Sequence, residues 1–120
     1  MNIAKMNDLY TLLIEISAPE EESDCVFTFR FLTSYDMINW IDETVIDIRQ
    51  FEGFETTTRA WAPQAIWDES KGMYMVYWAN STEENDCAGH YYAYTKDFKT
   101  FETAPEVLFG RWKLVIMLLA

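Results

Sequence analysis

The sequence predicts an all-β chain built from two four-stranded antiparallel units, and three observations support this. Aromatic residues make up 17% of the 120 residues, and aromatic side chains favour strands. No segment of about ten residues has the 3.6-residue apolar periodicity of a surface helix. An acidic segment ending in cysteine occurs twice, at 21–25 and 83–87, and this recurrence indicates an internal repeat.

The first unit begins with a strand predicted over 9–17, which Asn7-Asp8 precede. The acidic segment 18–24 then reads as a solvated loop. Phe27, Phe29 and Phe31 alternate along the next predicted strand, 26–33, so they share one face of it. A short outer strand is predicted over 44–48. Counting back by the repeat places an innermost strand at 1–5, where too little of the chain remains, so we expect this strand to be mostly missing.

The second unit has predicted strands at 60–67, 73–79, 89–95 and 107–109. The polar turn Asp68-Glu69-Ser70-Lys71-Gly72 separates the first two, as in a hairpin whose loop ends in glycine. Both flanking runs are apolar at nearly every position, which predicts strands covered on both faces. Pro63 has no N–H to donate, so it belongs at the start or edge of its strand.

The repeat runs through three segments in the same order. The acidic segments and the strands 12–16 and 74–78 share one offset in residue number, which is the offset from Cys25 to Cys87. The turns that begin at Asp36 and Asp97 have an offset smaller by one. These two aspartates have the pattern of turn-forming side chains. A period near 60 with about four strands is typical of a β-propeller blade.

The predicted fold is therefore a partial β-propeller of about two blades. Residues 1–57 form the first blade, 58–110 the second, and 111–120 an atypical apolar tail. Uncovered blade faces and strand edges favour association with copies of the chain or with a partner that supplies the missing blades.

Charge and composition exclude several classes of function. A net charge of −11 argues against nucleic acids and anionic membranes, which both need a basic surface. The apolar run 114–120 is too short to span a membrane. Residues 1–5 have no apolar segment of a signal peptide behind them, so a cytoplasmic location is the default expectation.

The sequence predicts no metal or cofactor site. Cys25 and Cys87 are too few for a zinc site and read as free thiols. His90 is a lone histidine on an aromatic strand, typical of a packed or surface side chain. The loops 20–24 and 83–86 offer carboxylates for calcium but lack the regular ligand spacing, so solvated turns are favoured.

A family resemblance lies in the second unit. Trp61-Ala62-Pro63-Gln64, followed by Asp68-Glu69 and the strand 74–78, resembles glycoside hydrolase family 43. Tyr94-Thr95-Lys96-Asp97-Phe98-Lys99-Thr100-Phe101 resembles the strand and turn that close a blade in that family. The resemblance covers roughly 27–109. It implies a five-bladed propeller that hydrolyses arabinose- and xylose-containing polysaccharides, of which this chain would hold about two blades.

The same resemblance implies an incomplete catalytic site. Such enzymes use one carboxyl group as a general acid and another to activate water. The family's general base maps near Asn2 or Ile3, and its pKa-tuning carboxylate maps to Gln64. Its general acid lies on a third blade. Glu102 and Glu106 fall on an outer turn and strand, so we expect no hydrolysis by this chain alone.

Arg59, Trp61 and Gln64 are the candidate substrate-binding residues. Trp61 offers a flat apolar face for a sugar ring and Arg59 offers hydrogen bonds, although Trp61 could equally pack in the core. Gln64 reads either as a former active-site position or as a satisfied polar residue on a buried strand. The chain is then an incomplete hydrolase fragment, a self-associating structural module, or a fragment completed by another chain.

Overall fold

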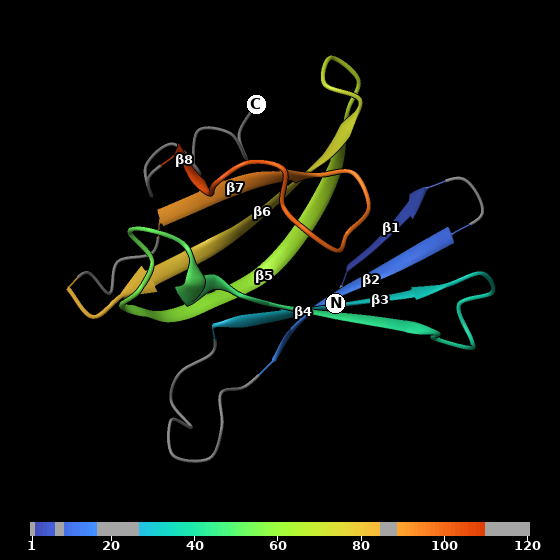
Figure 1. Ribbon diagram of the computed structural model, residues 1–120, viewed down its shortest axis with the longest axis horizontal. Coiled ribbons are helices and arrows are strands. Elements are labelled where there is room, and N and C mark those ends of the chain that lie inside the picture. The colour runs from blue at the N-terminus through green and yellow to red at the C-terminus, as the bar shows by residue number, and fades with distance from the viewer. Residues whose placement is uncertain (1, 7–8, 17–26, 85–88, 110–120) are drawn as a thin grey trace, which may run out of the picture.

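The computed structural model describes residues 2–6, 9–16, 27–84 and 89–109 as two four-stranded antiparallel sheets (Figure 1). The strands of each sheet follow chain order. The first sheet contains β1 (Asn2–Met6), β2 (Leu9–Ile16), β3 (Thr28–Ser34) and β4 (Asp42–Asp47). A short 3₁₀ helix, η2 (Ile48–Gln50), leads to the second sheet. That sheet contains β5 (Thr57–Asp68), β6 (Met73–Thr82), β7 (Gly89–Thr95) and β8 (Glu106–Phe109). The all-β prediction, with two four-stranded units, is confirmed.

The first sheet includes a short innermost strand, whereas the repeat predicts that this strand is mostly missing. β1 has five residues against twelve in β5, and it pairs with β2 from Asn2 opposite Leu13 to Met6 opposite Leu9. So short a segment shows no periodicity, and its place is set by hydrogen bonds to a neighbouring strand rather than by its own pattern. The predicted tail, 111–120, lies outside the described residues, as do Cys25 and Cys87.

The hairpin predicted around Asp68 is confirmed. β5 and β6 pair antiparallel as far as Asp68 opposite Met73, and Figure 1 shows their connecting turn projecting from the second sheet at the top of the view. The Asp68 carbonyl accepts hydrogen bonds from the N–H groups of Lys71 and Gly72 at 3.2 and 2.9 Å. Gly72 has a φ of +64°, which a residue without Cβ adopts at little cost.

The two turns predicted at Asp36 and Asp97 have the same structure. Asp36 accepts from the N–H groups of Ile38 and Asn39, both at 2.8 Å. Asp97 accepts in the same way from Lys99 and Thr100, at 2.8 and 3.2 Å. Such side-chain bonds to the following backbone are those that turn-forming aspartates make.

Each turn also contains a non-glycine residue in the left-handed region. Met37 has a φ of +62° and Phe98 a φ of +58°. Their N–H groups donate to the hydroxyls of Ser34 at 2.9 Å and Thr95 at 3.0 Å. These equivalent features share the offset that separates Asp36 from Asp97, so the internal repeat is structural as well as sequential.

The register refines the alignment of the two units. Ser34 and Thr95 are equivalent residues of the two turns, and their cross-strand partners are Tyr10 and Tyr74. The offset from Tyr10 to Tyr74 exceeds the offset from Cys25 to Cys87 by two, so the alignment inferred for β2 and β6 from the acidic segments is wrong by two positions. A shift of two leaves every side chain on the same face, because side chains alternate with a period of two.

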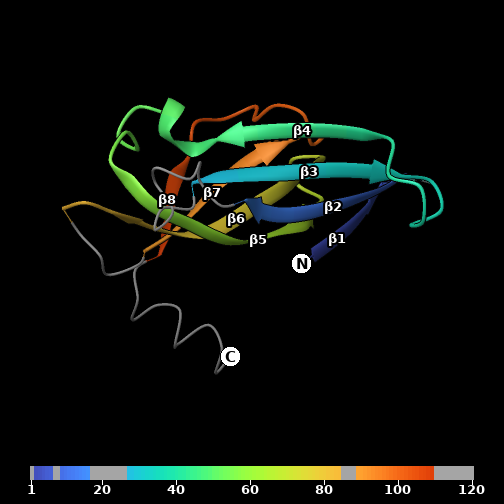
Figure 2. The same ribbon diagram turned by 90° about the horizontal axis from the view of Figure 1, so that it is seen from below.

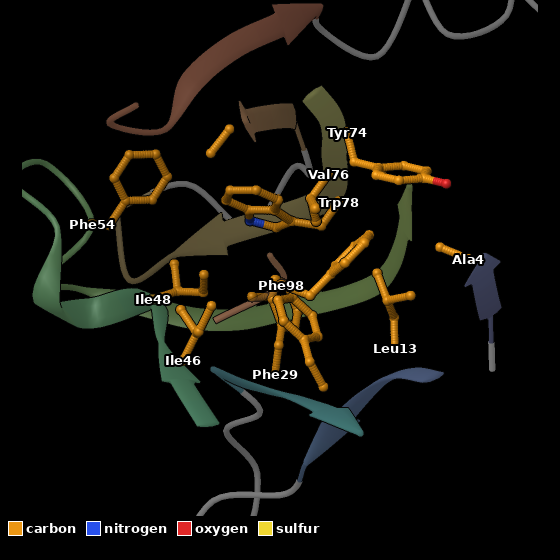
Figure 3. Close-up of a cluster of buried hydrophobic side chains, with 13 residues drawn as sticks. Ala4, Leu13, Phe29, Ile46, Ile48, Phe54, Tyr74, Val76, Trp78 and Phe98 are labelled. Atoms are coloured by element: carbon orange, nitrogen blue, oxygen red, sulfur yellow. The ribbon is translucent and has the colours of Figure 1, made fainter. Parts of the chain in front are cut away.

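The core lies between the two sheets (Figures 2 and 3). Phe29 and Phe31 of β3 are 0% and 1% exposed, and Val76 and Trp78 of β6 are 0% and 1% exposed. Phe29 meets Trp78 edge to face with ring centroids 5.5 Å apart. Such aromatic pairs add to the free energy of apolar burial. The predicted shared face of Phe27, Phe29 and Phe31 is confirmed, since all three are buried.

Only one face of the second sheet meets the first sheet among the described residues. The apolar runs of β5 and β6 predicted burial on both faces, but Ile66 of β5 is 54% exposed. From Met73 to Trp78 along β6, half-buried and buried side chains alternate. The composition of these strands therefore indicates a second covering layer that the described part of the chain does not supply.

We expect Phe29→Ala to lower the free energy of unfolding by about 3–5 kcal/mol, because the change leaves a cavity beside Trp78. Urea denaturation at pH 7 measures this. Ile38→Ala is the control, since Ile38 is 79% exposed in a turn and surface substitutions cost about 0.5 kcal/mol or less. Equal losses in the two variants would contradict the core assignment.

Candidate functional site

The three candidate substrate-binding residues lie on one face of β5. Arg59 pairs with Ser81, Trp61 with Ala79 and Gln64 with Tyr77. Directly paired residues share a face, and residues 77, 79 and 81 alternate with the buried Trp78. Arg59, Trp61 and Gln64 therefore point away from the first sheet, on the open side of the second sheet.

A β-bulge brings Gln64 onto this face. The register shifts between Trp61 and Gln64, and Ala62 within the shift has a φ of +56°. Without the extra residue, residues 61 and 64 would fall on opposite faces, since their separation is odd. Pro63 is buried in the bulge, and β5 is an edge strand. The prediction that Pro63 needs an edge is confirmed, although it lies mid-strand rather than at the start.

Trp61 is half-buried, with the Arg59 guanidinium 5.6 Å from the centroid of its ring. The sequence predicts that Trp61 either packs in the core or is open to a sugar ring, and the half-buried position is intermediate between the two. A side chain in the core would be covered on all sides, whereas part of this indole remains open to solvent.

Gln64 is exposed, and its Oε1 accepts a hydrogen bond from the Tyr77 hydroxyl at 2.7 Å. The side chain therefore has a polar partner, and its position is open to solvent rather than buried. An amide holds no charge, so Gln64 can hydrogen-bond a ligand or position a neighbour but cannot act as a carboxylate.

Two other tyrosines of the second sheet donate hydrogen bonds to carboxylates. Tyr92 donates to Glu106 at 2.9 Å and Tyr94 donates to Asp68 at 2.6 Å. The hydrogen bond to Asp68 raises the pKa of Tyr94 to about 12. Neither tyrosine is among the candidate substrate-binding residues predicted from sequence, although the period-two spacing of 92 and 94 places them on one face.

Glu106 lies on β8, at the edge of the second sheet opposite β5. It is therefore remote from the strand that bears Gln64. Glu102 is exposed in the turn before β8. β1 carries no carboxylate, and the carboxylate of β5 is Asp68, at its last residue. The described residues therefore present no pair of facing carboxylates near Gln64.

The described residues contain neither a cluster of metal-ligating side chains nor a helix that could span a membrane. Among residues 2–6, 9–16, 27–84 and 89–109, no group of three or more histidine, cysteine, aspartate or glutamate side chains could hold a metal ion. His90 is half-buried on β7, where desolvation lowers its pKa. Within the described part of the chain, no helix has the length and apolarity to cross a membrane.

We expect Asp68→Asn to destabilise the protein at pH 7 and the deficit to shrink as the pH falls below about 4. Hydrogen bonds from Ser70 and then Tyr94 lower the pKa of Asp68 from its usual 3.8. The lowered pKa gives stability above the unfolded-state pKa, and this stability is lost as the carboxylate is protonated. Urea denaturation between pH 7 and pH 3 measures it. Glu69→Gln removes a charge from the same turn and serves as the control; a deficit independent of pH would contradict the assignment.

Comparisons with known proteins agree with this architecture. The family model Glyco_hydro_43_rel, described as a probable glycosyl hydrolase domain, matches residues 22–116. The fold is similar to the crystal structure of 1,3Gal43A, an exo-β-1,3-galactanase from Clostridium thermocellum, with a TM-score of 0.72 at 16% sequence identity. That match covers 88% of this chain and 23% of the galactanase chain.

At this identity the likeness to the galactanase is one of fold. The comparison with curated proteins gave no match. The family model matches well over half of the chain, and the predicted resemblance and partial-propeller fold are both confirmed. The chain belongs to the family of probable glycosyl hydrolase domains related to glycoside hydrolase family 43.

Proposed function

We propose that this chain is a sugar-contacting part of a family 43-type propeller and does not cleave glycosidic bonds by itself. The observation that carries the proposal is a pair of amides at equivalent positions of the two sheets. Asn2 is opposite Leu13 and Gln64 is opposite Tyr77. Leu13 and Tyr77 are equivalent, because the offset between them equals the offset between Tyr10 and Tyr74. Those two tyrosines are the cross-strand partners of the equivalent turn residues Ser34 and Thr95.

The family resemblance implies carboxylates at these two positions or at a position next to them. Acid–base hydrolysis of a glycoside needs one group that donates a proton and one that removes a proton from water. Neither asparagine nor glutamine takes up or releases a proton near pH 7. The proposal of an incomplete site rests on these residues, and another chain or further blades would have to supply the missing carboxylates.

The open side of β5 supports contact with a sugar. Trp61 presents part of an indole ring, and aromatic faces pack well against the apolar face of a sugar ring. Arg59 beside it supplies fixed N–H donors, and Gln64 supplies amide donors. Arabinose- and xylose-containing oligosaccharides are the ligand class that we propose first. The named activity of 1,3Gal43A adds β-1,3-linked galactose oligosaccharides to the panel.

We expect no release of nitrophenol from 4-nitrophenyl α-L-arabinofuranoside, β-D-xyloside or β-D-galactoside at high protein concentration. Gln64→Glu should remain inactive, because one carboxylate without a partner does not complete the acid–base pair. The absorbance of nitrophenolate measures release. Turnover that persists through purification and is abolished by Gln64→Ala would contradict an incomplete site.

We expect Trp61→Ala to abolish the heat of binding in calorimetric titration with arabino- and xylo-oligosaccharides. Trp61 is the aromatic residue on the open face of β5, and a sugar ring can stack on it. Trp67→Ala is the matched control, because Trp67 lies on the same strand, opposite Tyr74, on the other face. No heat from the wild type at millimolar ligand, or equal loss in both variants, would remove sugar contact from the proposal.

A further inference from the structure

The two sheets each leave one face uncovered among the described residues, and both uncovered faces carry apolar side chains. Beside the sugar-contacting Trp61 and Gln64, the outer face of the second sheet is defined by Ile66, Met75, Tyr77 and Tyr92. The outer face of the first sheet is defined by Ile3, Arg30, Leu32, Glu43 and Val45. Ile3 and Val45 are 53% and 52% exposed, and Ile66 is 54% exposed. Exposed apolar surface of this kind favours contact with another protein surface.

The internal repeat shows how these faces relate to the interface that already exists inside the chain. Phe31 is buried against the second sheet, and its equivalent, at the offset from Asp36 to Asp97, is Tyr92 on the outer face of the second sheet. Leu13 is likewise 1% exposed in the core, and its equivalent is Tyr77, also on that outer face. The outer face of the second sheet is thus the counterpart of the buried face of the first.

The converse relation holds for the other uncovered face. Ala93 is fully buried against the first sheet, and its equivalent is Leu32, on the outer face of the first sheet. Tyr91 packs edge to face on Phe54 with centroids 5.1 Å apart, and its equivalent is Arg30, on the same outer face as Leu32. The two uncovered faces are therefore the repeat equivalents of the two surfaces that pack against each other between the sheets of one chain.

From this relation we propose that copies of the chain associate head to tail, the outer face of the second sheet of one copy packing on the outer face of the first sheet of the next. Each copy carries both halves, so no other protein is required. Such a heterologous interface can repeat until it closes into a ring. Because propellers close with about four to eight sheets, we expect rings of about two to four copies.

Two tyrosine hydroxyls of the second sheet's outer face already have partners, which lowers the cost of burying them. Tyr77 is bonded to Gln64 at 2.7 Å and Tyr92 to Glu106 at 2.9 Å. On the other face, Arg30 Nε lies 3.1 Å from the Glu43 carboxylate in an ion pair but makes no hydrogen bond to a described residue. The net charge of −11 opposes association, so we expect salt to strengthen it by screening the repulsion.

Sedimentation velocity and light scattering of the whole chain, over a hundredfold range of concentration and at low and moderate salt, test the proposal. We expect discrete assemblies that grow with concentration and with salt. Ile66→Glu on one face and Ile3→Glu on the other should each give monomers. Ile38→Glu is the control, because Ile38 is 79% exposed in a turn that belongs to neither face. Circular dichroism checks that each variant is folded, and Val45→Glu and Met75→Glu provide a second variant for each face.

Mixing the two monomeric variants distinguishes this interface from other modes of association. Ile66→Glu keeps an intact outer face on its first sheet, and Ile3→Glu keeps one on its second sheet. An equimolar mixture should therefore form a dimer with one copy of each. A wild type that stays monomeric, variants that assemble normally, or a mixture that does not recombine would overturn the proposal.

A third outcome concerns a sugar on the same face. A monomeric wild type whose oligosaccharide binding is lost in Ile66→Glu would overturn self-association and assign the outer face of the second sheet to a polysaccharide. The assembly test does not depend on hydrolysis or on Trp61, so its failure and the failure of the proposed function are distinguishable.

Discussion

The contact between the two sheets is the interaction on which the rest of the structure depends. Phe29 of the first sheet packs edge to face on Trp78 of the second, and Phe31 packs in the same way on Phe98, which lies in the turn after β7. A four-stranded sheet alone has little with which to bury its apolar face, so each sheet is stabilised by the other. The Tyr74 hydroxyl, which bonds to the Lys5 carbonyl, ties the short strand β1 to the same contact.

This dependence also fixes the candidate site. Since the first sheet covers one face of β5 and β6, Trp61 and Tyr77 on the other face remain partly open, and the bulge turns Gln64 to that side as well. Trp61, Gln64 and Tyr77 owe their exposure to that choice of face rather than to a pocket built around them. Among the described residues the site is an open surface, whose side chains can stack on a ligand and form hydrogen bonds.

Much of the architecture could be predicted from sequence because it depends on local signals. Alternating phenylalanines identified β3, a polar turn ending in Gly72 identified the hairpin, and Asp36 and Asp97 marked two turns of the same kind. The elements that were missed depend on partners. β1 is held by its register with β2, and the equivalence of Tyr10 and Tyr74 becomes visible only through cross-strand pairs. Trp61, Arg59 and Gln64 were placed together through a family resemblance, whereas the bonds of Tyr77, Tyr92 and Tyr94 required the paired strands.

The bulge in β5 has one more consequence, for the behaviour of the chain at high concentration. β5 is a twelve-residue edge strand, and a regular edge strand of that length could template fibrils through its outward backbone groups. Pro63 removes a donor from the middle of it, and the left-handed Ala62 breaks the regular spacing of the remaining donors. At the opposite edges, β8 has four residues and β4 carries Asp42, Glu43 and Asp47. These features disfavour cross-β polymerisation along the three edges.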